Sequence, residues 1–438
     1  MQANNVVFFT FFLSLFGIVE HATAQMTYQM PIEDTPHEGT WLQWPHQYEY
    51  GATYRNRLDA TWVAMTAALV NSENVHIVAY NATEQTRISN LLTLAGVPLS
   101  NVDFVLFPTN DVWVRDNGPI YATDTAGNLV IQDWGFNGWG GKFNYNLCNP
   151  IPTSIGNATG ATIVNLNATM TCEGGAVEHD GQGVFMATRS SILSQSPANT
   201  VRNPGMTQAQ AEAIFTQYLG VNKFIWLDGA TGTDDITDMH IDGFARFFDD
   251  QTIVAMNNAN LSYWGLSAAD INTLNNATNI DNIPYNFVHL PLTNGDVATT
   301  YGYDLGYKGS YVNYYVANSV VLVPNYNDPN DAVANNIIQG LFPDKTVVGI
   351  DVRNLYRYGG MVHCVTQQQP CAHINITGAQ DVCGGNTYTY SVPPIIGTLY
   401  EWQVTGGTIL SGQGTPQITI QWNNGPTNGA INVIQSNQ

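Results

Sequence analysis

The chain has 438 residues, of which 44% are hydrophobic and 11% charged, and its 34 acidic against 13 basic side chains give a net charge of −21 at pH 7. This hydrophobic content supplies a buried core and argues against a disordered chain. The negative field repels nucleic acid and anionic lipid, which leaves cationic small molecules or basic peptides as favoured partners, with a general adaptation for solubility as the alternative explanation of the charge.

The first 24 residues are typical of an export signal. An apolar run covers residues 6–19, and Ala22-Thr23-Ala24 follows it with the small-x-small pattern of a signal-peptidase site, although no lysine or arginine precedes the run. The run is too short to span a bilayer, and no second run of about 20 apolar residues is present. We therefore expect residues 1–24 to be a removed signal peptide and the mature protein to be secreted or held at the cell surface, without a membrane span.

Helical and strand patterns alternate over residues 25–371. Apolar side chains recur at helical spacing over residues 56–69 and 207–219, and a threonine start signal precedes the second of these helices. Short runs rich in β-branched and aromatic residues predict strands over residues 75–79, 104–107, 130–132, 224–227, 252–256, 320–323 and 346–350. The alternation predicts one large α/β domain.

The character of the sequence changes at residues 372–438. Threonine, tyrosine, valine and isoleucine alternate there with glycine, proline and asparagine turns, and no helical period is visible. The segment resembles the immunoglobulin-like or PKD-like β-sandwich modules that follow catalytic domains in secreted proteins, with Trp402 as a candidate core residue. Such modules need roughly 80 to 100 residues, so we expect a truncated module that lacks a final strand.

Cysteine usage is unusual for an exported chain. The five cysteines are Cys148, Cys172, Cys364, Cys371 and Cys383, and an odd number leaves at least one unpaired within a monomer. Pairing Cys148 with Cys172 and Cys371 with Cys383 is one arrangement that leaves Cys364 single. The sequence leaves this connectivity and the oligomeric state open.

Four polar clusters interrupt the large domain, each near the end of a predicted strand. They are NDVWVRDNGP at residues 110–119, CEGG at 172–175, TDMHIDG at 237–243 and GGMVHCVTQQQP at 359–370. Together they offer a thiol, a histidine that exchanges protons near neutral pH, and paired carboxylates that can hold a planar guanidinium by forked hydrogen bonds. An acidic protein with this set suits a cationic, electrophilic carbon, and a guanidinium meets that description.

The order of these motifs along the chain resembles that of the agmatine deiminase and Porphyromonas-type peptidylarginine deiminase family. The same resemblance includes WLQWPH at residues 41–46, DWGFNGWGG at 133–141, TDMHIDGFARF at 237–247, SYVNYY at 310–315 and NDPND at 327–331. The resemblance covers about residues 28–370. It implies the pentein fold, a five-bladed α/β propeller of ββαβ units around a central site. No sequence repeat reveals that symmetry.

The resemblance also implies a role for each matching residue. Cys364 would attack the guanidinium carbon, and His240 would protonate the departing ammonia and then deprotonate the hydrolytic water. Asp116 and Asp242 would clamp the guanidinium nitrogens, and Glu173 would orient His240. The intermediate would be an S-alkylthiouronium and the product a ureido compound, and the chemistry requires no metal and no other cofactor.

Each assignment has a structural alternative. Cys364 alone suits a buried apolar residue or half of a disulfide, and Asp116 after Arg115 suits a surface ion pair. His240 and Asp242 are two apart, so a strand would place them on one face as a structural hydrogen-bonded pair. Glu173 before two glycines suits the start of a tight turn.

Three further residues of these motifs carry weaker predictions. Asn313 is a candidate substrate contact or a buried brace for a loop, and Trp113 is a candidate wall of the substrate channel or a core residue. His363 points away from its neighbour Cys364 if the segment is extended, so we do not make it the base.

The ranking of possible substrates depends on which residues would bind the part of the substrate beyond its guanidinium group. The region after the first aspartate motif, residues 132–150, has no arginine and only Lys142, and its WGFNGWGG resembles the agmatine branch. Export and an appended β-module are instead features of the peptidylarginine branch. We expect agmatine, converted to N-carbamoylputrescine, with citrulline formation in peptides as the alternative.

Two other classes of function compete with a deiminase. The first is a metal hydrolase, but the sequence contains no recognised spacing of metal ligands. Its candidate ligands would be Glu173, Glu178, His179, Asp180, His240 and Asp242. A non-catalytic secreted binding protein would use the C-terminal module as its working part.

Overall fold

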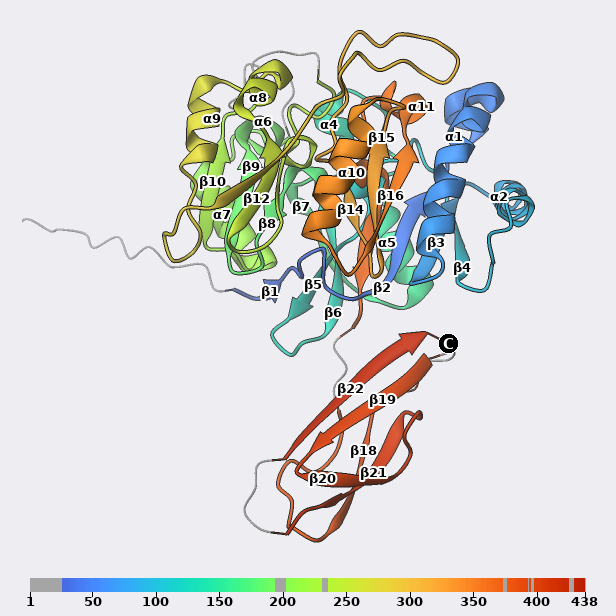
Figure 1. The fold of residues 1–438 in the computed structure, drawn as a ribbon, viewed down its shortest axis with the longest axis vertical. Coiled ribbons are helices and arrows are strands. Elements are labelled where there is room, and N and C mark those ends of the chain that lie inside the picture. Colours follow the sequence, from blue (N-terminus) through green and yellow to red (C-terminus); the bar gives the residue numbers. More distant parts are fainter. Residues whose placement is uncertain are drawn as a thin grey trace, which may run out of the picture.

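The computed structural model describes residues 26–193, 202–230, 235–372, 376–392, 394, 398–424 and 429–437. The predicted signal peptide at residues 1–24 lies outside this part of the chain. Figure 1 shows a large domain of helices and strands, followed by an all-β module at the end of the chain. Among the residues described, no helix is both long enough and apolar enough to cross a membrane.

The large domain contains five separate sheets within the described residues. The sheet that holds the start and the end of the domain has the order β17-β2-β3-β4. Its strands are β2 (His37–Gln43), β3 (Asn74–Ala79), β4 (Val102–Leu106) and β17 (Gln367–Pro370). The helices beside them are α1 (Gln47–Leu69) and α2 (Ala82–Leu94).

The second sheet has the order β1-β5-β6-β7. Its strands are β1 (Tyr28–Gln29), β5 (Ile120–Asp124), β6 (Leu129–Gly135) and β7 (Thr162–Thr171). Its helices are α3 (Val114–Asn117), α4 (Gly138–Gly141) and α5 (Ile151–Thr159).

The other three sheets have three strands each. Their strands are β8 (Glu178–His179), β9 (Val184–Thr188), β10 (Lys223–Leu227), β11 (Ala245–Phe247), β12 (Thr252–Met256), β13 (Asn286–Leu290), β14 (Tyr315–Val316), β15 (Val320–Asn325) and β16 (Thr346–Asp351). The intervening helices are α6 (Arg189–Ile192), α7 (Gln208–Leu219), α8 (Asn258–Trp264), α9 (Ala268–Asn275), α10 (Asn330–Leu341) and α11 (Arg353–Tyr356). Three short 3-10 turns complete the domain: η1 (Gly174–Ala176), η2 (Ile241–Gly243) and η3 (His363–Val365).

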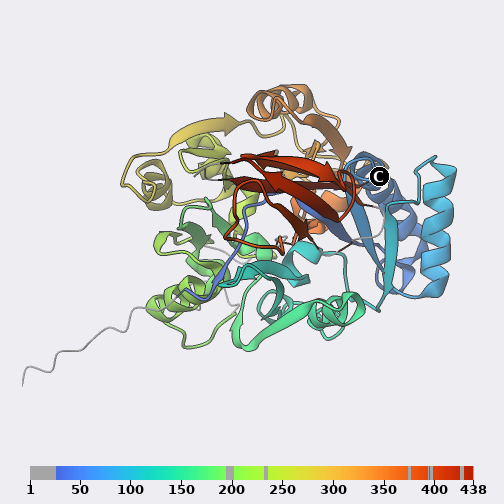
Figure 2. The same cartoon turned by 90° about the horizontal axis from the view of Figure 1, so that it is seen from below.

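All five sheets share one pattern of strand pairing. An antiparallel pair leads through a helical crossover to a parallel strand, as in β8, β9 and β10, and the same order recurs in β5-β6-β7, β11-β12-β13, β14-β15-β16 and β17-β2-β3. The sheets follow one another around the domain (Figure 2), and no ladder of hydrogen bonds joins them into one closed sheet among the described strands. The ββαβ unit is therefore present five times, although the sequence shows no repeat.

Local sequence explains several element boundaries. Thr207 and Gln210 form a reciprocal capping box at the start of α7, as the threonine start signal predicts. The predicted strand at residues 252–256 coincides with β12, and the other six predicted strands each overlap an observed strand. Helix α1 begins at Gln47, nine residues before the expected helix, and Gly51 with φ of 67° interrupts it.

The C-terminal module is all β, as expected. Its strands are β18 (Thr387–Ser391), β19 (Thr398–Thr405), β20 (Gly407–Ser411), β21 (Gln417–Trp422) and β22 (Ala430–Asn437). They form a three-stranded sheet, β18-β21-β20, and a two-stranded sheet, β19-β22. Trp402 is buried in the small core of this module, which confirms its predicted place.

Candidate active site

The polar motifs occupy the same position in all five repeated units. In each unit, one residue of a polar motif stands just before the first strand. These residues are Asp116 in α3, Glu173 before η1, Asp242 in η2, Asn313 before β14 and Cys364 in η3. Helix α3 packs against η1 and η3, and η1 packs against η2. Because the units repeat around the domain, their first segments converge, and the motifs that are far apart in sequence meet.

Cys364 lies in the 3-10 turn η3 and is half-buried. Its Sγ is 3.5 Å from Oδ1 of Asn313, which also accepts a hydrogen bond from the backbone N–H of His363 at 3.0 Å. The Asn313 amide donates to the carbonyl of Asp242 at 3.3 Å. Asn313 therefore braces the thiol loop against η2, and the bracing alternative describes its contacts better than a substrate contact does.

Asp116, Asp242 and His240 surround one common point next to Gly175. A Cβ atom added to Gly175 would lie 2.7 Å from His240 Nδ1, 2.9 Å from Asp116 Oδ1 and 3.1 Å from Asp242 Oδ2. The backbone N–H of Gly175 donates to Asp116 at 3.3 Å, and the Trp139 indole donates to the other oxygen of Asp116 at 2.9 Å. Both aspartates are buried, so the surface ion pair considered for Asp116 is wrong.

His240 has an acidic partner on each ring nitrogen. Its Nε2 is 3.0 Å from Glu173 Oε2, and its Nδ1 is 3.6 Å from Asp116 Oδ1. Glu173 is itself held by the guanidinium of Arg202, whose Nε donates to both of its oxygens at 3.0 and 3.2 Å. Glu173 thus contacts His240 in the geometry that an orienting role requires.

The strand considered as a structural alternative for His240 and Asp242 does not form. Asp238 and Met239 have left-handed φ values of 58° and 69°, and a 3-10 turn begins at Ile241. The buried Asp238 side chain is held by Arg202 and Lys142. These tertiary ion pairs overcome the alternating pattern and aim both functional side chains into the site.

The pKa values of Asp116 and His240 are both raised above those of free side chains. Burial raises the pKa of Asp116 to about 6, where Glu173 and Asp242 add to the rise and His240 opposes it. Burial disfavours the charged form of His240, but Asp116 and Glu173 more than offset this and raise its pKa to about 9. At neutral pH His240 is therefore an imidazolium.

The thiol and the second aspartate are shifted in opposite senses. Burial, with Asp242 and Asp116 nearby, raises the pKa of Cys364 well above its usual range. Burial also disfavours ionised Asp242, but its hydrogen bond to His363 and the charge of that ring lower its pKa below the ordinary value. The empty site thus holds a neutral thiol beside an ionised carboxylate, an arrangement that an incoming cation would stabilise.

Comparison with known proteins identifies the family. The Porphyromonas-type peptidyl-arginine deiminase family matches residues 29–370, and a PKD-like domain matches residues 369–438. Agmatine deiminase of Pseudomonas fluorescens (strain SBW25) is 30% identical over 80% of this chain and 97% of its own length. Agmatine deiminase of Pseudomonas syringae pv. tomato is also 30% identical, over 78% of this chain and 95% of its own length.

The chain belongs to the Porphyromonas-type peptidyl-arginine deiminase family. It is a hydrolase that acts on C–N bonds of amidines. Solved structures share its α/β fold: an inferred arginine deiminase of Porphyromonas gingivalis has 31% identity and a TM-score of 0.66, covering 78% of this chain and 98% of its own. Agmatine deiminase of Enterococcus faecalis has 24% identity and the same TM-score, covering 78% of this chain and 96% of its own.

The deiminase has a cavity of about 610 Å³ beside Asp116. Trp139 connects the cavity to Asp116, because its side chain lines the cavity and its indole N–H donates a hydrogen bond to Asp116. Trp113 is 9% exposed, lines the cavity and packs against Gly360 in the thiol motif, so it serves both as core and as cavity wall. The other aromatic residues in the lining are Tyr50, Phe143 and Tyr358, and the acidic ones are Glu49 and Asp111.

The structure does not gather the ligands that a metal hydrolase would need. Glu178 accepts from Arg246 at 2.7 Å, and Asp180 accepts from Tyr285 at 2.9 Å, so both carboxylates already have partners. Over the part of the chain that the structure describes, no group of three or more His, Cys, Asp or Glu side chains is arranged to hold a metal ion.

The disulfide arrangement considered from sequence is contradicted, because all five cysteines are free thiols. Cys148 lies in the main core cluster, where its sulfur accepts from the backbone of Asn110, and Cys172 lies in a different cluster. Tertiary packing separates the two sulfurs, and Cys364 is left single as expected.

Three residues of the site were missed in the sequence. Arg202 fixes Glu173, Trp139 holds Asp116, and Gly175 leaves the space that the substrate would enter. Trp139 and Gly175 lie inside motifs that the resemblance singled out. Arg202 gave only one signal, its place among 13 basic residues in a strongly acidic chain.

Proposed function

We propose that this deiminase hydrolyses a guanidinium compound through Cys364, releasing ammonia and a ureido product, and that agmatine, converted to N-carbamoylputrescine, is the preferred substrate. One observation carries the proposal: two buried carboxylates and His240 surround a single space beside a half-buried thiol. Carboxylates in that arrangement hold a guanidinium by forked hydrogen bonds and fix its carbon for attack.

Substrate binding starts the chemistry by changing the charge of the site. A guanidinium between Asp116 and Asp242 places a positive charge beside Cys364, which lowers the pKa of a thiol that the two carboxylates raise in the free enzyme. The thiol then loses its proton to solvent, and the thiolate forms a bond to the guanidinium carbon.

His240 supplies the proton for the leaving group. As the carbon–nitrogen bond breaks, the imidazolium donates its proton to the nitrogen, and ammonia leaves from a thiouronium bound to Cys364. The neutral imidazole then takes a proton from water, which attacks the carbon. The carbon–sulfur bond then breaks, the proton of the added hydroxyl group passes to the departing sulfur of Cys364, and the neutral ureido product leaves the restored thiol and imidazolium. Glu173 holds the ring through both steps.

The cavity lining favours an amine at the far end of the substrate. It offers Glu49 and Asp111 with aromatic rings, and contains no lysine or arginine. Burial raises the pKa of Asp111 to about 7, so a bound cation would favour its ionised form. Lys142 is already bound by Asp238 and by the carbonyls of residues 235 and 236, so it is occupied and cannot bind a substrate carboxylate without losing these partners. The agmatine deiminases among its relatives support the same ranking.

Peptidyl arginine is the second candidate substrate. It is supported by the family description and by the predicted export signal. An assay of ammonia release from agmatine, free arginine and an arginine-containing peptide separates the two, with Cys364→Ser as the inactive variant and Cys371→Ser, an exposed thiol, as the matched control. Preference for the peptide reverses the ranking, and no release from any of the three overturns the proposal.

We also propose that the five sheets are the blades of a pentein propeller, that residues 25–371 form the catalytic domain and 372–438 the appended module, and that the mature protein is secreted or cell-surface bound. The repeated ββαβ units support the first point, and the pattern of residues 1–24 supports export. Amino-terminal sequencing of protein recovered outside the cell tests export, with Gln25 expected as the first residue.

A further inference from the structure

His363, the neighbour of the thiol, is buried between two carboxylates. Its Nδ1 is 2.7 Å from Oδ2 of Asp242, and its Nε2 is 2.7 Å from Oε2 of Glu33. An ionised carboxylate only accepts hydrogen bonds, so a ring that satisfies both partners must donate from both nitrogens and carry a positive charge. Only 2% of the His363 side chain is exposed, so water cannot replace either partner.

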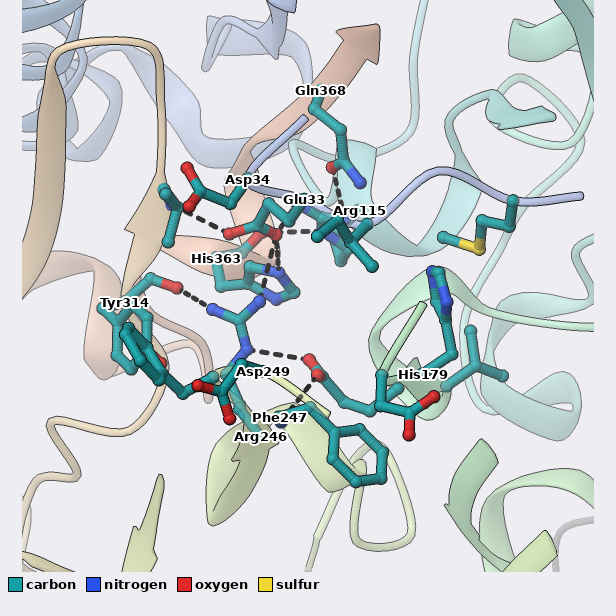
Figure 3. Close-up of a pocket in the computed structure, with 18 of the residues that line it drawn as sticks. Glu33, Asp34, Arg115, His179, Arg246, Phe247, Asp249, Tyr314, His363 and Gln368 are labelled. Atoms are coloured by element: carbon teal, nitrogen blue, oxygen red, sulfur yellow. Dashed lines mark hydrogen bonds and ion pairs between the residues drawn. The ribbon is translucent and has the colours of Figure 1, made fainter. Parts of the chain in front are cut away.

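Glu33 reaches this position from the segment between β1 and β2. Its Oε2 also lies 3.1 Å from Arg246 and 3.3 Å from Arg115, and its Oε1 accepts from the backbone N–H of Val316 at 2.8 Å. Burial opposes ionised Glu33, but Arg246 and His363 more than offset this and hold its pKa well below the usual range. Figure 3 shows these side chains gathered at one pocket.

With all three carboxylates of this cluster ionised, the charges balance when His363 is protonated. Three carboxylates face it or its partners, from Asp242, Glu33 and Glu178, and two guanidinium groups pair with them, from Arg115 and Arg246. A neutral His363 would leave one negative charge uncompensated in a buried cluster, which is costly. The other ionisable groups facing Asp242 are Asp116, His240 and the thiol of Cys364.

The two clamp aspartates show what His363 contributes. Both are almost fully buried, and each faces the other. Within the described part of the chain, the partners of the Asp116 carboxylate are an indole, a backbone N–H and the more distant ring of His240, and its pKa is raised to about 6. Asp242 has His363 at 2.7 Å, and its pKa is lowered instead.

We propose that Glu33 and His363 are positioning residues for the guanidinium clamp: Glu33 holds His363 in its doubly protonated form, and His363 keeps Asp242 ionised and aimed at the substrate. Neither residue touches the reacting atoms. The inference rests on the proposed function and adds a requirement to it, because the clamp is complete only when the segment carrying Glu33 is docked behind the site.

The test compares Glu33→Gln with Asp34→Asn. The first change keeps the size of the side chain and removes its charge. The second removes a charge from the next residue of the same segment, where Asp34 pairs with Lys345 on the surface and lines the same pocket. The measurement is kcat/KM against pH for ammonia release from agmatine.

We expect Glu33→Gln to move the acidic limb of the profile upward by about one pH unit and to steepen it from one proton to two, because Asp242 then protonates together with Asp116. KM should rise more than kcat falls, and the alkaline limb should stay in place. Asp34→Asn should match the unmodified enzyme. An unchanged profile for Glu33→Gln, or a uniform loss at every pH, overturns the proposal.

A second measurement does not depend on activity or on how the variants fold. His363-Cys364 is the only His-Cys pair in the sequence, so pairwise isotope labelling of histidine and cysteine singles out this histidine for NMR. We expect both of its ring nitrogens to be protonated at pH 7.5 in the unmodified protein. A neutral His363 ring overturns the proposed positioning role. If the unmodified enzyme releases no ammonia while the His363 ring is charged, only the proposed function is overturned.

Discussion

At the scale of single residues, burial and neighbouring charge separate the roles of chemically similar groups. Asp116 and Asp242 flank the same space, yet their pKa values move apart because His363 contacts only Asp242. His240 is held protonated between Asp116 and Glu173. A site with an acid already charged and a thiol still neutral is inert until a cation arrives, which protects a half-buried thiol from unwanted reactions.

These pKa values predict a bell-shaped dependence of kcat/KM on pH for the unmodified enzyme. Below about 6, Asp116 takes up a proton and the clamp loses a charge, and above about 9, His240 loses the proton that ammonia needs. Steady-state rates of ammonia release from pH 5 to 10 check this. Activity that keeps rising beyond pH 10 contradicts the assigned role of His240.

Asp116→Asn should lower kcat/KM for the guanidinium substrate by about 100-fold, since a charged hydrogen bond in a buried site is worth about 2–3 kcal/mol. It should also remove the acidic limb near pH 6, which belongs to this carboxyl. Asp103→Asn is the control, because Asp103 is a largely exposed partner of His76. An equal loss in the two variants contradicts the clamp.

At the scale of elements, the site depends on three short 3-10 turns and on the four-residue helix α3 rather than on the longer helices. In η1, Gly175 approaches η2 and α3 so closely that no side chain fits between them. In η3, the thiol loop is held by Asn313, while the following strand, β17, pairs with β2. The glutamines after the thiol brace this strand, since Gln368 accepts from Arg115 and Gln369 accepts from Trp41.

Gly175→Ala should therefore abolish most activity with little loss of stability. The new methyl group would stand 2.7 Å from His240 and 2.9 Å from Asp116, which displaces both and blocks the space for the guanidinium. We expect kcat/KM to fall at least about 100-fold, since misplacements of 1 Å have costs of this order. Gly243→Ala in η2 is the matched control, because the nearest atom to its Cβ would be 4.0 Å away. Equal effects of the two changes contradict the geometry.

At the scale of the whole molecule, the last strand of the large domain pairs with a strand near its beginning. Strand β17, just after the thiol, pairs with β2, and the backbone of Cys371 donates to Pro36 at 2.9 Å. The curated relatives align over nearly their whole length with about four fifths of this chain, so a protein without the C-terminal module is complete in that family.

Truncation after Ala372 should therefore leave kcat and KM for the guanidinium substrate unchanged within about twofold, because none of the described residues of the C-terminal module belongs to the site. Truncation before Gln367 is the contrasting variant, since it removes β17 and its ladder with β2, and it should destroy folding. Thermal unfolding and ammonia release check both. Loss of activity in the longer variant contradicts the independence of the two parts.

The amino-acid sequence by itself determined the α/β class, the place of seven of the strands and the motifs that carry the candidate site residues. Strand β12 coincides with its prediction and α7 follows its capping signal, because both depend on neighbours a few residues away. The motifs around Asp116, Glu173, His240, Asp242 and Cys364 were also visible, since clustered polar residues stand out in a chain with only 11% charged residues.

Only the tertiary structure decided how these groups act. Contacts between residues separated by 100 positions or more bring His363 to Asp242 and Glu33, and no local pattern encodes them. The left-handed turn before His240 is fixed by Arg202 and Lys142, so an alternating sequence became a turn rather than a strand. Protonation states depend on burial and on the charges that folding places nearby, and for this reason they became visible only once the five units were assembled.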